Sequence, residues 1–276
     1  MDIRSSKKLN NGIDMPYLGL GVFRAENGDE TYNAVKWALE TGYRHIDTAA
    51  VYGNEESVGK AIAESGVPRE ELFITTKLWN EDMRQERQEK AFADSLKRLG
   101  LDYVDLYLIH WPVPDHYAGS YKVLEKLYKE GRMRAIGVSN FQQHHLDTLL
   151  KESSVVPAVN QIELHPLLKQ QALLDYCTAL NIAVTAWSPL GGTKADLPHD
   201  PVLTEIGKKY GKSAAQIIIR WNIQRDVIVI PKSSKQHRIK ENADVFDFEL
   251  TADDMARINA MNTNRRLGSD PDNFSF

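Results

Sequence analysis

The chain has 276 residues, of which 42% are hydrophobic and 26% charged, with 34 basic against 38 acidic side chains. These proportions are those of an ordinary globular protein and exclude a disordered, collagen-like or membrane-spanning chain. The net charge of −4 provides no basic field for nucleic acid or an anionic membrane, so neither is expected as a partner. Cys177 is the only cysteine, which excludes an intrachain disulfide, and no apolar signal core follows Met1; we therefore expect a cytoplasmic protein.

Short apolar runs rich in β-branched residues alternate with longer segments of helical periodicity. A hairpin is predicted first, over residues 8–16, because Asn11-Gly12 lies between apolar residues. The predicted strands then follow in chain order at 18–21, 45–47, 72–77, 104–110, 134–138, 158–161, 183–187 and 227–230.

Helical periodicity fills the gaps between these strands. The predicted helices are 29–40, 54–64, 85–99, 121–130, 141–150, 170–180, 202–224, which we expect to divide into two, and 235–245. Asn140 with Gln143 three residues later predicts a capping box at one helix start. An extra helix at 252–261 and a tail at 262–276 complete the chain.

Eight strands that are each followed by a helix indicate an all-parallel sheet. Their nearly continuous apolar character fits strands that are buried on both faces. We therefore predict one (β/α)₈ barrel domain over residues 1–276, with the hairpin closing its floor. The alternative is an open doubly wound sheet, which produces the same alternation but usually has fewer strands.

Polar residues occur where the predicted strands end, which is where chemistry gathers in such a barrel. Asp47 ends the second strand, Lys77 the third and His110 the fourth. A lysine that closes an apolar run is rarely buried without an anion, and Asp47 on the neighbouring strand is its natural partner.

Asp47, Lys77, His110 and the nearby Tyr52 have a coherent joint chemistry. A tyrosine hydroxyl is a poor acid at neutral pH, and an adjacent ammonium is expected to lower its pKa. A neutral histidine can hydrogen-bond to a carbonyl oxygen and orient it. The set therefore predicts carbonyl reduction with a hydride from a cofactor, without a nucleophile or a metal.

Three segments carry a family resemblance. Gly42-Tyr-Arg-His-Ile-Asp-Thr-Ala49 is the first and Arg134-Ala-Ile-Gly-Val-Ser-Asn-Phe141 the second; the third is Ile230-Pro-Lys-Ser233 followed by Arg238 and Glu241-Asn242. With Lys77 and His110 at the matching strand ends, the chain resembles the aldo-keto reductases along essentially its whole length. It looks most like the compact microbial members that reduce small aldehydes and dicarbonyls.

The resemblance implies a role for each matching residue. Tyr52 is expected to be the general acid, Lys77 and Asp47 the pair that sets its pKa, and His110 the group that orients the carbonyl. Phe23, Trp79, His110 and Trp111 are expected to contact a small carbonyl substrate. The residues expected to bind NADP(H) are Gly21, Val22, Asp47, Ser139, Asn140, Gln161, Trp187, Ser188, Leu190, Lys232, Ser233, Arg238, Glu241 and Asn242.

Within that cofactor set the residues have separate tasks. Ser139, Asn140 and Gln161 match the positions that hold the nicotinamide carboxamide, and Trp187 matches the aromatic ring that stacks on the nicotinamide. Lys232, Ser233 and Arg238 match the site of the adenosine 2′-phosphate, which their charge also favours. In the family, threonine is more common at the position of Val22 and tyrosine at that of Trp187. Both replacements keep the shape class of the side chain, so we expect them to affect the fine tuning of the cofactor site and not activity itself.

Two other functions remain open at this stage. The same barrel and cofactor site could serve a redox-sensing partner subunit, as in channel-associated members of this family. A metal-dependent hydrolase is the other alternative, but paired strand-end metal ligands are lacking. Adjacent His144 and His145 are expected to face different sides of a helix, so we predict no metal site.

The preferred substrates are predicted from the loops around the pocket. The loops after the fourth and seventh strands are short, and the tail is polar until Phe274 and Phe276. We therefore expect methylglyoxal-like dicarbonyls and aromatic aldehydes to react better than ketosteroids. We also expect a monomer, because no extended apolar interface is evident.

Overall fold

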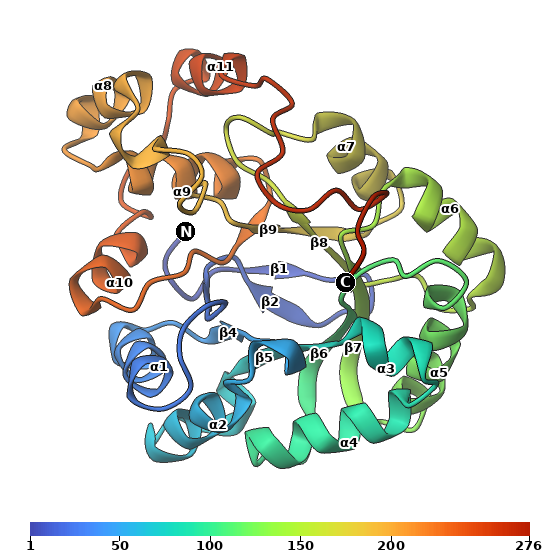
Figure 1. Ribbon diagram of the computed structural model, residues 1–276. Helices are drawn as coiled ribbons and strands as arrows, with labels where there is room; N and C mark the ends of the chain where they lie inside the picture. Colours follow the sequence, from blue (N-terminus) through green and yellow to red (C-terminus); the bar gives the residue numbers. More distant parts are fainter.

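A computed structural model describes residues 1–276 and contains an eight-stranded parallel sheet surrounded by helices (Figure 1). The strands pair in chain order, each with the next. They are β3 (Gly19–Gly21), β4 (His45–Asp47), β5 (Phe73–Leu78), β6 (Val104–Ile109), β7 (Met133–Ser139), β8 (Val159–Glu163), β9 (Ala183–Trp187) and β10 (Ile228–Val229).

The first and last strands of this sheet also meet. Parallel bridges join Leu18 to Val229 and Gly21 to Lys232, and the Gly21 N–H donates to the Pro231 carbonyl at 3.3 Å. A Cβ at Gly21 would lie 2.8 Å from the Ile230 oxygen, so glycine permits the close approach at this seam. The predicted (β/α)₈ barrel is confirmed, and the open doubly wound sheet is wrong.

Helices follow the strands and cover the outside of the barrel (Figure 1). They are α1 (Asp29–Thr41), α2 (Glu55–Glu64), α3 (Asn80–Arg84), α4 (Gln88–Leu99), α5 (Tyr117–Lys129), α6 (Gln143–Glu152), α7 (Gln171–Ala179), α8 (Pro201–Tyr210), α9 (Ala214–Gln224), α10 (Gln236–Ala243) and α11 (Ala252–Ala260). The expected division of 202–224 into two helices is confirmed. None of the helices has both the length and the apolar character that crossing a membrane requires.

Two helix starts differ from the sequence prediction by three residues or more: α5 begins at Tyr117 rather than at 121, and α4 begins at Gln88 rather than at 85. The short helix α3 was not predicted. The predicted capping box at Asn140 is wrong, because Gln142 is the N-cap of α6 and pairs reciprocally with His145. Asn140 instead adopts a left-handed conformation with φ of 66°, which an asparagine tolerates better than most residues.

The hairpin closes the barrel floor as predicted. Strands β1 (Ser6–Lys8) and β2 (Asp14–Pro16) pair antiparallel, with Lys8 opposite Asp14. Leu9 and Met15 of this hairpin are buried against inward-facing strand residues that include Phe73. Apolar side chains therefore fill this end of the barrel, and the opposite end is left for polar chemistry.

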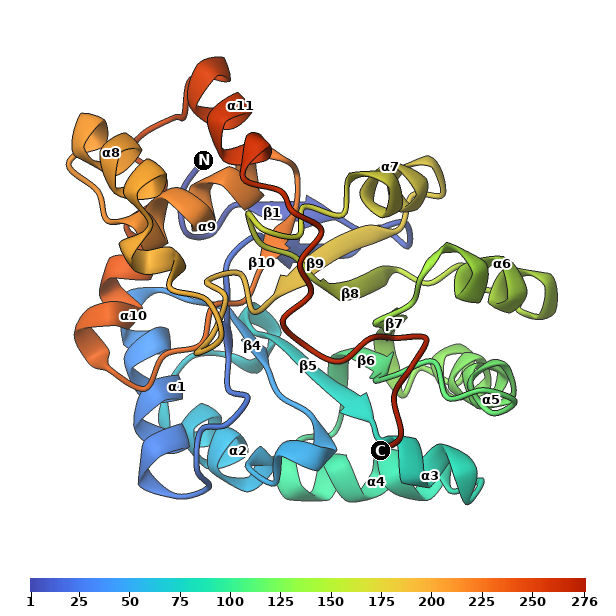
Figure 2. The same cartoon turned by 45° about the horizontal axis from the view of Figure 1, so that its top comes forward.

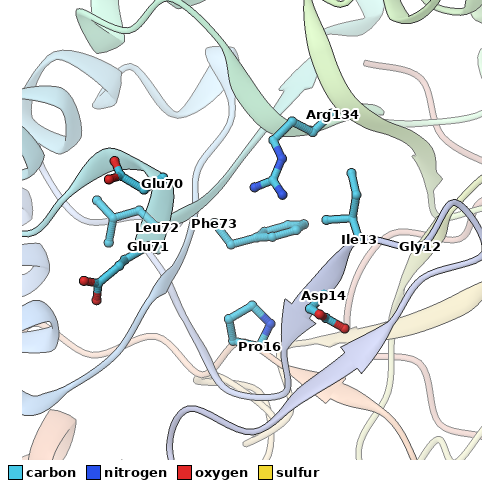
Figure 3. Close-up of a pocket in the computed structure, with 9 residues that line it drawn as sticks. All are labelled: Gly12, Ile13, Asp14, Pro16, Glu70, Glu71, Leu72, Phe73 and Arg134. Atoms are coloured by element: carbon cyan, nitrogen blue, oxygen red, sulfur yellow. The ribbon is translucent and has the colours of Figure 1, made fainter.

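A cavity of about 300 Å³ lies beside the hairpin (Figure 3). It is lined by Gly12, Ile13, Asp14, Pro16, Glu70, Glu71, Leu72, Phe73 and Arg134. Phe73 and Arg134 stand at the amino ends of β5 and β7, and Arg134 is already paired with Asp105 at 2.7 Å. The cavity is thus at the opposite end of the strands from Asp47, Lys77 and His110.

The C-terminal tail crosses the other end of the barrel. After α11 the chain, drawn in red, passes β9 and β8 and ends beside α3 (Figure 2). The backbone oxygen of Phe276 accepts hydrogen bonds from Asn80 at 3.1 Å and Arg84 at 2.8 Å, which fixes the last residue against α3.

Candidate active site

Lys77 is the centre of the polar cluster that the sequence predicted. Its side chain is fully buried in β5. The Nζ atom donates to Asp47 Oδ1 at 2.6 Å, to the Thr48 carbonyl oxygen at 2.8 Å and to the Tyr52 hydroxyl oxygen at 3.3 Å. Because an ammonium has three N–H donors, these contacts satisfy it completely.

The other members of the cluster come from neighbouring strand ends. Asp47 is the last residue of β4, and the 3₁₀ helix η1 (Ala50–Tyr52) turns Tyr52 back over the barrel. His110 follows β6 directly, and its ring lies 5.7 Å from that of Tyr52, centroid to centroid, at an angle of 71°. The structure therefore brings Asp47, Tyr52, Lys77 and His110 into one site.

Electrostatics gives each group a defined charge state. Burial alone would lower the pKa of Lys77, but the Asp47 carboxylate and the Tyr52 hydroxyl raise it, so the side chain stays an ammonium. Burial and the Lys77 charge hold the pKa of His110 well below its usual range, so the imidazole is neutral.

The pKa of Tyr52 differs from the sequence expectation. Burial raises this pKa above its usual value, and the Lys77 ammonium opposes the rise without reversing it. Lys77 does act to lower the pKa of Tyr52, as expected, but the prediction that this pKa is lowered overall is wrong for the protein without cofactor. The reason is the desolvation of the phenolate, which sequence spacing does not reveal.

Three residues expected to hold a carboxamide adjoin this cluster. Ser139 Oγ donates to the Gln161 carbonyl oxygen at 2.9 Å, and Gln161 Nε2 donates to Asp47 Oδ2 at 2.7 Å. Asn140 Nδ2 donates to the His110 carbonyl oxygen at 3.0 Å. One hydrogen-bonded network therefore joins the predicted carboxamide residues to the predicted catalytic ones.

Trp187 lies at the edge of the same network. It is the last residue of β9, is partly exposed, and donates from Nε1 to Asn140 Oδ1 at 2.9 Å. Ser188, the next residue, has φ of 48°, a conformation that is uncommon for serine and clusters at functional sites. Leu190 is partly exposed on the loop that follows.

The residues expected around the adenosine phosphate lie at the amino end of α10. Lys232 and Arg238 are both exposed, and the only ion pair of Lys232 is with Glu30 at 3.6 Å. The Arg238 guanidinium makes no ion pair. Ser233 is buried. Asn242 is also buried and Glu241 accepts a hydrogen bond from Ser213; both lie farther along α10, where the family resemblance implies the edge of the adenine. Two cations thus remain available to an anion here.

Aromatic rings surround the Tyr52 and His110 side chains. Phe23 is 52% exposed and its ring centroid lies 5.0 Å from that of Tyr52. The Trp79 ring lies 5.3 Å from that of His110. Trp111 is buried and lies 5.2 Å from Phe274 of the tail.

The aromatic rings beside Tyr52 and His110 form one wall of the site, and the C-terminal tail contributes more to this aromatic wall than its sequence suggested. Phe276 stacks on Trp79 with a centroid distance of 5.8 Å and an interplanar angle of 3°, and it lies 5.1 Å from Trp111. The sequence predicts only a tail that is polar until Phe274 and Phe276. Two phenylalanines at alternate positions were the signal that could have indicated an aromatic contact.

His144 and His145 also contact the tail. Their Nε2 atoms lie 3.0 and 3.4 Å from Asp272 Oδ1, so the prediction that the two rings diverge is wrong. The Gln142 N–H donates to His145 Nδ1 at 3.1 Å, which puts the proton of the neutral ring on Nε2. A metal could approach His145 only at Nε2, which carries this proton, so the contacts favour a hydrogen-bonded tie to the tail over metal ligation.

Comparison with known proteins gives consistent matches over nearly the whole chain. The family model described as "Aldo/keto reductase family" matches residues 17–263. A glyoxal reductase of Bacillus subtilis (strain 168) is 56% identical over 99% of both chains. A methylglyoxal reductase of Escherichia coli (strain K12) is 51% identical over 97% of both.

A solved structure extends the comparison to three dimensions. The aldo-keto reductase of Bombyx mori, determined in complex with NADP, is 43% identical to this chain and superposes with a TM-score of 0.90. The alignment covers 97% of this chain and 95% of the other. The fold is therefore shared with an aldo-keto reductase whose solved structure contains NADP.

Proposed function

Since this chain belongs to the aldo/keto reductase family, we propose that it reduces small aldehydes and dicarbonyls of the glyoxal and methylglyoxal type to alcohols, with NADPH as the preferred cofactor. The observation that carries the proposal is the fully bonded Lys77, which links Asp47 to the Tyr52 hydroxyl beside a neutral His110.

Each residue of this cluster has one task in the proposed reaction. His110, kept neutral, donates a hydrogen bond to the substrate oxygen and orients the carbonyl over Tyr52. Lys77 donates to the Tyr52 oxygen, so the phenolic proton is not used in that bond and is free to pass to the substrate oxygen. Solvent then returns a proton to the Tyr52 oxygen, with the phenolate stabilised by Lys77 until that transfer.

The residues present fit NADP(H), which would supply the hydride that the carbonyl carbon receives. Ser139, Asn140 and Gln161 offer the hydroxyl and amide groups that a carboxamide requires, directly beside Asp47. Lys232 and Arg238 offer two exposed cations. Only Lys232 has a carboxylate partner, Glu30 at 3.6 Å, so the pair suits a 2′-phosphate and supports a preference for NADPH over NADH.

The aromatic wall supports a small substrate. Phe23, Trp79, Trp111 and the tail rings Phe274 and Phe276 lie close around the predicted acid. A planar aldehyde or a two- to three-carbon dicarbonyl would pack between such rings, whereas a steroid would require the tail to move. A cytoplasmic location and a monomeric state, both expected from the sequence, stay predictions.

A carbonyl panel assayed in parallel with NADPH and NADH tests the proposal. We expect the highest kcat/KM for methylglyoxal, glyoxal and aromatic aldehydes with NADPH, low values for ketosteroids, and no effect of a chelator. NADPH binding without turnover of any carbonyl would favour the redox-sensing subunit instead. A ketosteroid as the best substrate would show that the tail opens, and chelator-sensitive activity would favour the metal-dependent alternative.

A further inference from the structure

Glu163 is a buried carboxylate that the proposed reaction does not use. It is the last residue of β8, and its side chain is inaccessible to solvent. It accepts hydrogen bonds from His165 Nε2 at 2.9 Å and from the backbone N–H groups of Leu267 at 2.6 Å and Gly268 at 3.0 Å. Both backbone donors belong to the C-terminal tail, so a residue of the barrel holds the tail in place.

The charge state of Glu163 suits this task. Burial alone would raise its pKa, but the hydrogen bonds from His165, Leu267 and Gly268 hold the pKa below its usual value. Arg266, with Nη1 3.7 Å from the carboxylate, adds a positive charge from the tail. Glu163 is therefore ionised and bound to three consecutive tail residues.

Gly268, once held there, touches Trp187. A Cβ at Gly268 would lie 2.3 Å from Trp187 Cη2 and 2.9 Å from Glu163 Oε2. The φ angle of Gly268 lies outside the left-handed region, so lack of space and not backbone conformation excludes a side chain. The tail backbone thus packs directly on the outer edge of the indole ring.

The opposite end of the same ring is fixed by the barrel. Trp187 Nε1 donates to Asn140 Oδ1 at 2.9 Å, and Asn140 is itself bound to the His110 carbonyl oxygen. The indole is therefore held at both ends, by Asn140 on the side of the reaction centre and by Gly268 on the side of the tail.

We propose that Glu163 is a positioning residue which, by fastening Leu267 and Gly268, holds Trp187 in the orientation that stacks on the nicotinamide. This inference rests on the proposed function, because it takes Trp187 as the stacking ring. It makes tail docking and cofactor binding mutually dependent. By thermodynamic reciprocity, a loosened tail weakens NADPH binding, and bound NADPH protects the tail.

The first arm of the test uses the wild-type protein. The contact of Glu163 with Leu267 and Gly268 is called the clamp below. Arg265 and Arg266 lie just before these two tail residues, and trypsin cleaves after arginine. Saturating NADPH should slow cleavage after these two residues at least fivefold, measured by mass spectrometry of the released C-terminal peptide. Cleavage at an unchanged rate with NADPH bound would overturn the proposed coupling.

The second arm uses Gly268→Ala with Gly119→Ala as its matched control. Gly119 is exposed on α5, and a Cβ there would meet no atom within 4 Å. We expect Gly268→Ala to raise the NADPH dissociation constant about tenfold by displacing the indole, as measured by fluorescence titration. Gly119→Ala should bind NADPH like the wild type.

The third arm removes the charge of Glu163 itself. Glu163→Gln keeps the size of the side chain but turns an amide NH₂ toward groups that are all donors. We expect a similar rise in the NADPH dissociation constant, and faster tryptic cleavage after Arg265 and Arg266. Gly268→Ala leaves the barrel core intact and decides the matter if Glu163→Gln fails to fold.

Trp187→Ala separates failure of this inference from failure of the proposed function. If Trp187→Ala binds NADPH much more weakly while Gly268→Ala and Glu163→Gln bind normally, the clamp is wrong and the stacking role stands. If Trp187→Ala also binds NADPH normally, the assignment of Trp187 to the cofactor falls together with the clamp. Carbonyl reduction itself is measured separately by the panel described above.

Discussion

At the scale of single residues, Lys77 is the group on which the others depend. A buried ammonium is costly unless all its donors are paired, and here a carboxylate, a carbonyl and a phenol satisfy them. The same charge helps to keep His110 neutral and favours the phenolate of Tyr52. In the proposed reaction, one cation thus prepares both a hydrogen-bond donor and a proton donor.

The pH dependence of reduction follows from these charges. Because the pKa of His110 is held well below its usual value, kcat/KM should stay level between pH 5.5 and 8.5, with no acid limb near the ordinary histidine pKa of about 6.5. Tyr52, as the proposed general acid, must be protonated, and its pKa is raised, so activity should fall only as the pH rises beyond about 10. A limb near pH 6.5 that disappears in His110→Gln would contradict this charge assignment.

At the scale of elements, we propose that the loop after β10 and the start of α10 set the preference for NADPH. Lys232 precedes this helix and Arg238 lies in its first turn, so both charges stand where the amino-terminal dipole also favours an anion. Lys240 carries a comparable exposed charge in the last turn of the same helix. Lys240 is therefore a matched control position for substitutions at Arg238.

Replacing Arg238 with alanine should weaken NADPH far more than NADH. A charge-assisted hydrogen bond contributes roughly 1.5–3 kcal/mol, which corresponds to a loss of about ten- to a hundredfold in NADPH affinity. Lys240→Ala should leave both affinities unchanged, and added salt should reduce the NADPH preference of the wild type. Equal losses for NADPH and NADH in Arg238→Ala would show that Arg238 does not contact the 2′-phosphate.

At the scale of the whole molecule, stability and chemistry occupy opposite ends of one barrel. The hairpin fills the floor with Leu9 and Met15, whereas Lys77 and its partners lie at the carboxyl ends of the strands. The tail then covers part of the carboxyl end through contacts with Glu163, Asn80 and Arg84. Substitutions at the floor should therefore change folding without changing the site.

Met15→Ala tests that separation. Met15 is fully buried, and truncating such a side chain typically costs about 2–5 kcal/mol in the free energy of unfolding. Chemical denaturation should show this loss, while kcat and the NADPH dissociation constant of the folded protein stay at wild-type values. A change in either kinetic or binding constant beyond about threefold would contradict the independence of the two ends.

The features that the sequence could predict are those that depend on local patterns. The barrel, the hairpin and the Asp47, Tyr52, Lys77 and His110 cluster follow from local periodicity and from the polar residues at strand ends. The clamp between Glu163 and Leu267 spans 104 residues and involves a backbone donor, so no local pattern reports it. The raised pKa of Tyr52 likewise depends on burial by the fold.

The most direct test of the account is the turnover of Tyr52→Phe with methylglyoxal and NADPH. The substitution removes the hydroxyl proton and little volume, and losing a general acid should lower kcat by about 10²–10⁴-fold. The NADPH dissociation constant should not change, and Tyr32→Phe, whose hydroxyl bonds Glu64 on the surface, should keep full activity. A Tyr52→Phe protein that retains more than about half of its turnover would contradict the assignment of Tyr52 as the proton donor.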